Sequence, residues 1–378
     1  MKLENKHYVW LLVGIFILRA ITYPSIHNNT DELKYLEFAK QMCNGDYSYF
    51  DQEKSYHMPL YMVILCLTSP LHGYVPDVAE LVTYSMGILM VIGWIIFIPE
   101  EFDKKRFIIL MVANALVWVY SYQVMIDVPV AVFMSLGMLN FYLFTYNDSD
   151  KNFFWCFVFI TLAILTKETA LLFVPIGAAF LILYQNWDGR AWLLIAMPLL
   201  VYLIYLVATG PDESIWLLKE MLKVEENPGK LKLNLPYARY PTIVTVFAVF
   251  GVGVIAIIKT YFLDYKGNEE LAKFCIFTLV LYAVWATFYL FRIPYNLPRY
   301  HITLMPFFTL MISEYTRKHD KWIYWATLVF TLAVGFAIAY YFHMEAGSIN
   351  MENISIEEFE KVAYIYSVKN DSWRTIER

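Results

Sequence analysis

The chain has 378 residues, of which 59% are hydrophobic and 17% are charged, whereas a soluble globular domain carries about 25% charged residues. Aromatic residues make up 18% and the mean hydropathy is +0.49, so the chain holds more apolar side chains than one core can bury, and many of them must face lipid. The formal net charge of −5 provides no basic field that would attract nucleic acid, so we expect no nucleic-acid partner. The four cysteines stand singly and predict neither a disulfide framework nor a CxxC metal site.

Apolar runs with few charges recur along the chain, and a bilayer core of about 30 Å requires about 20 such residues per helix. Polar stretches end near residue 56 and cover residues 209–239. The apolar segment 58–71 contains Pro59 and Pro70 and has the length of an interfacial or re-entrant segment, so it is not counted as a span. The sequence therefore predicts an all-α polytopic membrane protein with about eleven transmembrane helices, at residues 8–23, 78–98, 107–122, 128–144, 153–165, 169–183, 192–208, 243–258, 274–291, 302–312 and 322–342.

Lysine and arginine are concentrated in alternate connections between these runs, which predicts that this side is cytoplasmic. Residues 209–240 act against this assignment because they place five cations on the opposite side. We expect one integral membrane domain over residues 1–378, with outer loops at 25–77 and 209–240 and an outer C-terminal tail at 343–378. These expectations describe a multi-pass protein of the plasma or cytoplasmic membrane with its functional groups on the outer face.

Asp31 and Glu32 lie at the start of a predicted amphipathic helix on the outer surface. Asn29 can cap this helix, Glu32 follows three residues later as in a capping box, and apolar residues then recur at helical spacing. Two interpretations remain open. The acids suit the positive end of the helix dipole, or a carboxylate at the boundary of lipid and water acts as a general base toward a hydroxyl group.

Other candidate residues lie where apolar runs begin or end on the same predicted side. Asp127 precedes Val-Pro at a helix start, where an acid is also ordinary. Lys167 has almost no polar linker around it, so its charge is costly unless it is paired or snorkels to the interface. Arg299 and Tyr300 lie at the outer end of a late run, where cations can hold a phosphate. His57 is equally compatible with a structural role, since the histidines show no metal-ligand spacing.

The order of these motifs resembles the GT-C glycosyltransferases, specifically the superfamily of protein O-mannosyltransferases and lipid A aminoarabinose transferases. That family begins its first outer loop with an Asp-Glu pair and a surface helix, then a Gly-Asp pair and a His/Lys-Pro-Pro-Leu element. An acid-x-Pro at a helix start, a Leu-Thr-Lys before an apolar run and a late Arg-Tyr follow. The corresponding residues here are Asp31-Glu32, Gly45-Asp46, His57-Met58-Pro59-Leu60-Tyr61, Asp127-Val128-Pro129, Leu165-Thr166-Lys167 and Arg299-Tyr300.

The resemblance implies a donor in which a dolichyl or undecaprenyl phosphate carries a monosaccharide, and an acceptor hydroxyl on a protein, lipid or glycan. Asp31 would accept the acceptor proton, Glu32 and Asp127 would orient the acceptor or assist Asp31, and the anomeric centre would be inverted. The residues that would bind the donor phosphate are Lys167, Arg299, Tyr300 and His57. No cofactor is required, a divalent metal ion is compatible with the carboxylates but not demanded by them, and membrane lipids are expected as further partners.

A protein of another class remains as the alternative. A polytopic transporter or lipid flippase would use Asp31, Asp127 and Lys167 as an intramembrane relay. The candidate charges gather on one predicted face rather than in the middle of the membrane, and no paired repeats are visible. The sequence therefore favours a glycosyltransferase, without identifying the sugar or the acceptor.

Overall fold

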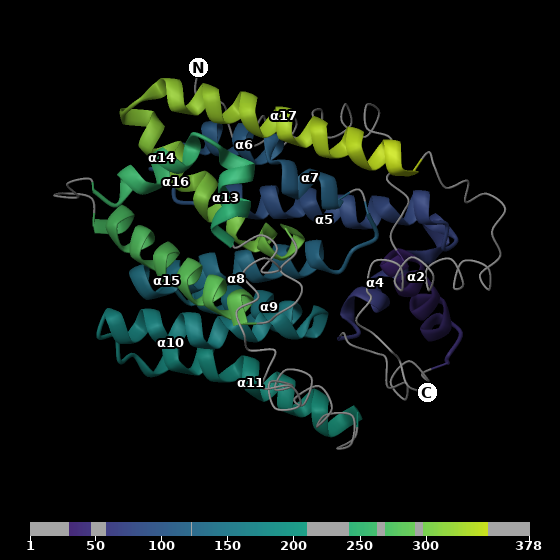
Figure 1. The fold of residues 1–378 in the computed structure, drawn as a ribbon. Coiled ribbons are helices and arrows are strands. Elements are labelled where there is room, and N and C mark those ends of the chain that lie inside the picture. Colours follow the sequence, from purple (N-terminus) through teal and green to yellow (C-terminus); the bar gives the residue numbers. More distant parts are fainter. Residues whose placement is uncertain are drawn as a thin grey trace.

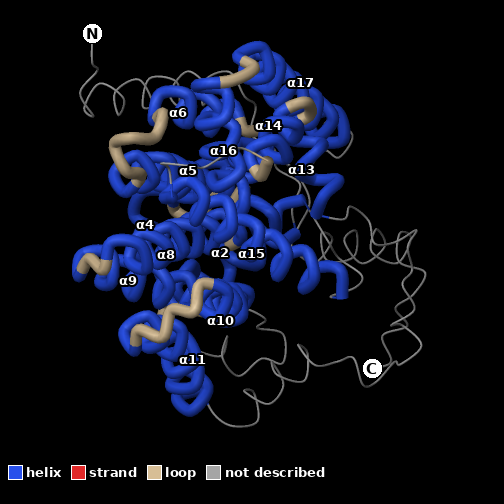
Figure 2. Tube along the Cα trace, turned by 90° about the vertical axis from the view of Figure 1, so that its left-hand side faces the viewer, coloured by secondary structure: helices blue, strands red, loops and turns tan. Residues whose placement is uncertain are grey.

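The structure, a computed structural model, describes residues 30–46, 58–121, 123–209, 242–262, 269–291 and 298–346. All regular elements in this part of the chain are helices, which agrees with the predicted all-α class. Figure 1 shows their arrangement, and Figure 2 shows the same bundle turned by 90°. The helices are α2 (Thr30–Cys43), α4 (Leu60–His72), α5 (Pro76–Phe97), α6 (Lys104–Ala113), α7 (Ala115–Ser121), α8 (Asp127–Asn147), α9 (Asp150–Thr166), η1 (Glu168–Leu172), α10 (Phe173–Leu183), α11 (Gly189–Thr209), α13 (Thr242–Phe250), α14 (Gly253–Thr260), α15 (Glu269–Phe291), η2 (Pro298–Leu304), α16 (Met305–Lys318) and α17 (Lys321–Ala346).

The helix α8 lies in the interior of the bundle because it is apolar on all sides. Most of its side chains are buried, and it packs along α9 and against α5. Gly137 allows α9 to approach closely, since a Cβ atom at this position would lie 2.5 Å from Cδ1 of Ile160. Asp127 is the first residue of the same helix, so the element that fills the core also carries a charged group at its end.

Three described helical segments are long and apolar enough to cross a membrane, namely Val78–Phe97, Asp127–Asn147 and Glu269–Tyr289. Shorter apolar segments accompany them at Leu60–His72, Glu168–Leu183, Gly189–Tyr205 and Lys321–Ala337. The prediction of about eleven transmembrane helices is therefore not confirmed. The first expected span, residues 8–23, lies outside the described residues.

Two of the predicted spans are divided. Oδ1 of Asn114 accepts the backbone N–H groups of Leu116 and Val117 at 3.1 and 3.3 Å, so α6 ends at this residue and α7 begins after it. Gly251 has a φ of +50° and separates α13 from α14, and a Cβ atom there would lie 2.6 Å from the ring of Phe330. A hydropathy scan does not find these breaks, because Asn and Gly are uncharged and the runs around them stay apolar.

The helices α2 and α4 form a pair at one end of the bundle, at the right in Figure 1. A disulfide joins Cys43 of α2 to Cys66 of α4, a pairing that the sequence did not predict. The residues Val124 and Ile126, which precede α8, belong to the same apolar cluster as this pair. The predicted helix after residue 29 is confirmed, and the segment 58–71, expected as interfacial or re-entrant, is helical from Leu60.

Candidate functional site

Asp127 is the residue around which the candidate site is built. It lies in the first turn of α8, and it is only 4% exposed. Pro129 follows in the same turn, where its missing N–H has no helical partner to lose. A carboxylate buried this deeply requires cations or hydrogen-bond donors around it, and segments distant in the sequence supply two cations.

Lys167 is the first of these cations. It interrupts the helices α9 and η1 with an extended backbone, at φ −156° and ψ 137°. Its ammonium nitrogen Nζ lies 2.5 Å from Oδ1 of Asp127, and the residue is 5% exposed. The structure therefore contradicts the alternative in which Lys167 snorkels to the interface, since its charge is paired inside the protein.

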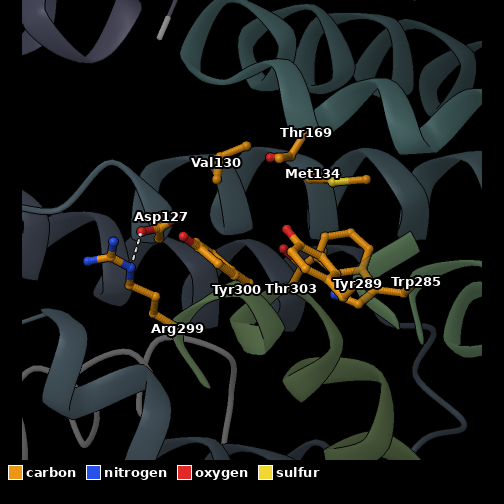
Figure 3. A pocket seen from close by; sticks show the side chains of 9 residues that line it. All are labelled: Asp127, Val130, Met134, Thr169, Trp285, Tyr289, Arg299, Tyr300 and Thr303. Carbon is orange, nitrogen blue, oxygen red and sulfur yellow. Dashed lines mark ion pairs between the residues drawn. The ribbon is translucent and has the colours of Figure 1, made fainter. Parts of the chain in front are cut away.

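Arg299 of η2 is the second cation. Its Nε lies 3.2 Å from Oδ2 of Asp127, the contact drawn as a dashed line in Figure 3. Its Nη1 lies 3.2 Å from Sδ of Met125, in the segment that leads into α8. Asp127 thus bridges two cations, and we call Asp127, Lys167 and Arg299 the charged triad. Removal of one member leaves a buried charge less well compensated.

Tyr300 lies beside both cations of the triad. Its ring centroid is 5.0 Å from Nζ of Lys167 and 5.5 Å from Cζ of Arg299, within the range of about 6 Å for cation–π interactions. Tyr289 of α15 stacks on Tyr300 with ring centroids 5.2 Å apart. The stack fixes an aromatic ring next to the cations, and the role of Tyr300 in binding the donor phosphate stays a prediction.

A small cavity lies among these side chains. It measures about 10 Å³, which is close to the minimum that admits one water molecule. A monosaccharide does not fit into this volume, so substrate binding here requires the lining side chains to move. Figure 3 shows three aromatic side chains along one side of the cavity and smaller side chains along the other, namely Tyr300, Tyr289 and Trp285 opposite Val130, Thr169 and Met134.

Glu32 attaches α2 to the site. Its Oε1 accepts the backbone N–H of Val124 at 2.9 Å, and the residue is 4% exposed. Val124 lies three residues before Asp127, so this charge-assisted hydrogen bond connects the start of α2 to the segment that presents the triad. The contact gives Glu32 a role in positioning the start of α8, and its expected role in orienting the acceptor or assisting Asp31 stays a prediction.

Two predicted site residues have no described side-chain contacts. Asp31 lies in the first turn of α2, but its side chain is outside the described part of the structure, as is all of His57. Within the described ranges, no group of three or more His, Cys, Asp or Glu side chains could hold a metal ion. The roles of Asp31 and His57 therefore stay predictions.

Sequence reasoning did not identify the aromatic wall of the cavity. Trp285 and Tyr289 are four residues apart on α15, which places them on the same face of that helix. Trp285 donates its Nε1–H to Nδ1 of His301 at 3.2 Å. Burial lowers the pKa of His301 to about 3, so the ring accepts this bond in its neutral form. The spacing of the two aromatic residues was visible in the sequence, but it is equally typical of core packing.

The sequence of the chain matches a family model over part of its length. The model described as dolichyl-phosphate-mannose-protein mannosyltransferase matches residues 57–216. This segment contains Asp127 and Lys167 but neither Asp31 nor Arg299. No curated protein matches the chain.

Solved structures share the fold. ArnT from Cupriavidus metallidurans superposes in its apo state with a TM-score of 0.60 and 16% identity, over 86% of this chain and 62% of ArnT. The same protein bound to undecaprenyl phosphate gives a TM-score of 0.58 and 16% identity, over 88% of this chain and 64% of ArnT. A third structure is the archaeal oligosaccharyltransferase AglB from Archaeoglobus fulgidus in complex with an inhibitory peptide and a dolichol-phosphate. It superposes with a TM-score of 0.55 and 12% identity, over 89% of this chain and 56% of AglB.

ArnT and AglB are GT-C glycosyltransferases, so the resemblance inferred from the order of the motifs is confirmed at the level of the fold. The chain spans less than two thirds of the length of either protein. With its apolar helices, the chain is a multi-pass integral membrane protein.

Proposed function

We propose that this GT-C protein is a membrane glycosyltransferase that moves a monosaccharide from a polyprenyl-phosphate donor to an acceptor hydroxyl. The observation that carries the proposal is the convergence of Lys167 and Arg299, from separate parts of the chain, on one buried carboxylate beside a stacked tyrosine. The match to the mannosyltransferase family model supports it, as do the lipids present in the structures of ArnT and AglB, undecaprenyl phosphate and dolichol-phosphate.

The charged triad suits a lipid-phosphate leaving group. Transfer breaks the bond between the anomeric carbon and a phosphate oxygen, and the electron pair leaves with the polyprenyl phosphate, so negative charge grows on the phosphate. Fixed cations stabilise such charge best when they need no reorganisation during the reaction. Asp127 holds Lys167 and Arg299 in place before a donor arrives, and the Tyr300 ring lies beside both cations. Asp127 therefore acts on the donor through its two partners.

Asp31 is the proposed general base. The acceptor oxygen forms a bond to the anomeric carbon, and its proton passes to the carboxylate of Asp31. Attack from the face opposite the phosphate inverts the anomeric centre. The adjacent residue, Glu32, supports this assignment because its hydrogen bond to Val124 fastens the first turn of α2 near the start of α8.

The disulfide between Cys43 and Cys66 supports placing the site on the outer face of the membrane. Disulfides form and persist in oxidising compartments and are rare in a reducing cytosol. The two cysteines lie on α2 and α4, which pack with the segment preceding Asp127. The charged triad and the disulfide therefore belong to the same end of the bundle, the one that we assign to the outside.

The proposal is tested with purified protein in detergent and radiolabelled polyprenyl-phosphate mannose and related donors. We expect wild-type protein to release lipid phosphate, and Asp31→Asn to lower the turnover by about 10²- to 10⁴-fold with donor binding retained. Glu37→Gln is the matched control, because Glu37 is exposed on the same helix. Full activity of Asp31→Asn refutes the base assignment, and folded wild-type protein that neither binds nor turns over any donor refutes the transferase.

A further inference from the structure

A second cavity lies at the opposite end of α8 from the charged triad. It has a volume of about 330 Å³, and we call it the distal cavity. Among the described residues, its lining contains one cation, Lys273. Its aromatic wall consists of Tyr142, Tyr146, Phe180, Tyr184 and Trp187. A helix rises about 1.5 Å per residue, so Tyr142 and Tyr146 lie about 22 to 28 Å along α8 from Asp127. The distal cavity is therefore separate from the candidate site and plays no part in the proposed transfer.

Lys273 provides positive charge in the distal cavity. Its Nζ lies 5.2 Å from the ring centroid of Tyr146 and 5.9 Å from that of Tyr184. Within the described residues it has no carboxylate at ion-pair distance. The carboxylates of Glu269, Glu270 and Glu101 lie close enough to Tyr146 to act on it electrostatically, but none of them lines the cavity. The cation is thus held by aromatic faces and remains available to an anionic ligand.

Two amides complete the polar part of the lining. Gln185 and Asn186 follow α10 and line the cavity with Lys273. An amide side chain offers N–H donors to an anionic oxygen, and an ammonium group offers three more. This donor set suits a phosphate group.

The surroundings of the distal cavity are those of a membrane boundary. Ile182 and Leu183 at the end of α10 are 55% and 63% exposed, and Trp187 is 70% exposed. Trp187 stacks on Trp192 of α11 with ring centroids 5.9 Å apart. Tryptophan and tyrosine gather where a bilayer meets water. The last turns of α8 and the first turns of α15 line this cavity, and both helices are long enough to cross the bilayer.

We propose that the distal cavity binds the headgroup of an anionic phospholipid. The phosphate lies at Lys273 and the amides of Gln185 and Asn186, and an acyl chain follows the exposed apolar surface of Ile182 and Leu183. The volume is at the lower end of the range of about 300–1,000 Å³ for ligand pockets, which fits a headgroup rather than a whole lipid. Basic pockets between transmembrane helices are a recurrent way of holding anionic headgroups.

The test counts lipids bound to the purified full chain by native mass spectrometry. The protein is titrated in a non-ionic detergent with phosphatidylglycerol, with phosphatidylcholine of the same acyl chains, and with inorganic phosphate. We expect one phosphatidylglycerol to bind in preference to phosphatidylcholine, and Lys273→Gln to weaken it about fivefold, the effect of one cation near a membrane surface. Lys273→Arg keeps the charge and should retain the binding.

The matched control is Lys151→Gln. Lys151 is also a cation over an aromatic ring, 5.9 Å from the centroid of Phe97, but it lies outside the cavity. This variant should bind phosphatidylglycerol as the wild type does. Asn186→Trp, which fills the cavity without removing the charge, should weaken binding and provides the test if Lys273→Gln does not fold. Any one of three results overturns the proposal. The two lipids bind equally, the variants Lys273→Gln and Asn186→Trp both bind phosphatidylglycerol as the wild type does, or inorganic phosphate displaces the lipid.

Discussion

Removal of Asp127 should destabilise the protein more than removal of either cation that it binds. The Asp127→Asn variant loses two ionic contacts, at 2.5 Å to Lys167 and at 3.2 Å to Arg299, and leaves a buried and a half-buried cation next to each other. The Lys167→Met variant loses only one contact, because Asp127 keeps Arg299. The order of the two effects therefore follows from the central position of the carboxylate.

The magnitude follows from the contacts that are lost. The contact of Lys167 with Asp127 is a hydrogen bond between charged groups, which contributes about 1.5–3 kcal/mol, and the loss of the ionic contact with Arg299 at 3.2 Å adds to that cost. This agrees with the cost of about 3–5 kcal/mol for removing one partner of a buried ion pair. We therefore expect the free energy of unfolding to fall by about 3–5 kcal/mol in Asp127→Asn and by about 1.5–3 kcal/mol in Lys167→Met. The double variant should lose less than the sum of the two, because it buries one unpaired cation fewer than Asp127→Asn alone.

The assay is reversible unfolding in mixed micelles with increasing sodium dodecyl sulfate, followed by tryptophan fluorescence. Lys151→Met serves as the control for loss of an exposed lysine, with an expected change within about 0.5 kcal/mol. If Asp127→Asn destabilises the protein no more than Lys167→Met, or if the two effects add in the double variant, then Asp127 does not bridge the two cations.

Three further predictions address the surroundings of the triad and the core. Glu32→Ala should lower turnover at least about tenfold because the N–H of Val124 loses its acceptor. Glu32→Gln keeps an oxygen there and should retain most activity. If a kinetic comparison finds the same loss of turnover in both variants, the charge itself is required. Tyr300→Leu should weaken donor binding by about 2- to 30-fold, the range of a cation–π contact, and Tyr300→Phe should not, as a titration with labelled donor would reveal. Gly137→Ala should lower the free energy of unfolding by about 1–3 kcal/mol in the same micelle assay, because its Cβ meets α9. A Cβ at Gly189 would have no atom within 4 Å, so Gly189→Ala should leave the stability unchanged. Equal stabilities of the two variants would contradict the close packing of α8 on α9.

The triad residues were predictable from the sequence, but their arrangement was not. Lys167 stood out because a charge next to an apolar run is costly unless it has a partner. Asp127 stood out as an acid before Val-Pro at a helix start, and Arg299 as a cation at the outer end of a run, where it can hold a phosphate. Their mutual contact depends on how α8, α9 and η2 pack, and no local pattern encodes this. The sequence therefore predicted both cations as phosphate ligands and did not predict that Asp127 pairs with both of them.

The bounds of the helices were predicted well where a long apolar run determines them. They were predicted poorly where a single residue ends one helix and begins the next. The predicted run 128–144 corresponds to α8, which extends by a turn or less at each end. The run 107–122 is broken by Asn114, whose side chain caps the next helix, and this change is invisible to an average over many residues. The disulfide was missed for a similar reason, because the spacing of Cys43 and Cys66 becomes informative only when both helices are placed.

The disulfide between α2 and α4 also makes the attachment of α2 depend on the redox state of its compartment. Cys43 and Cys66 lie 23 positions apart on two helices, and a disulfide between them forms and persists only in an oxidising compartment. Without the disulfide, apolar packing and the hydrogen bond from the Val124 N–H to Glu32 still hold α2, with its Asp31-Glu32 pair, against the start of α8. A chain made in a strongly reducing cell would therefore keep these contacts but would leave this surface helix without its covalent tether.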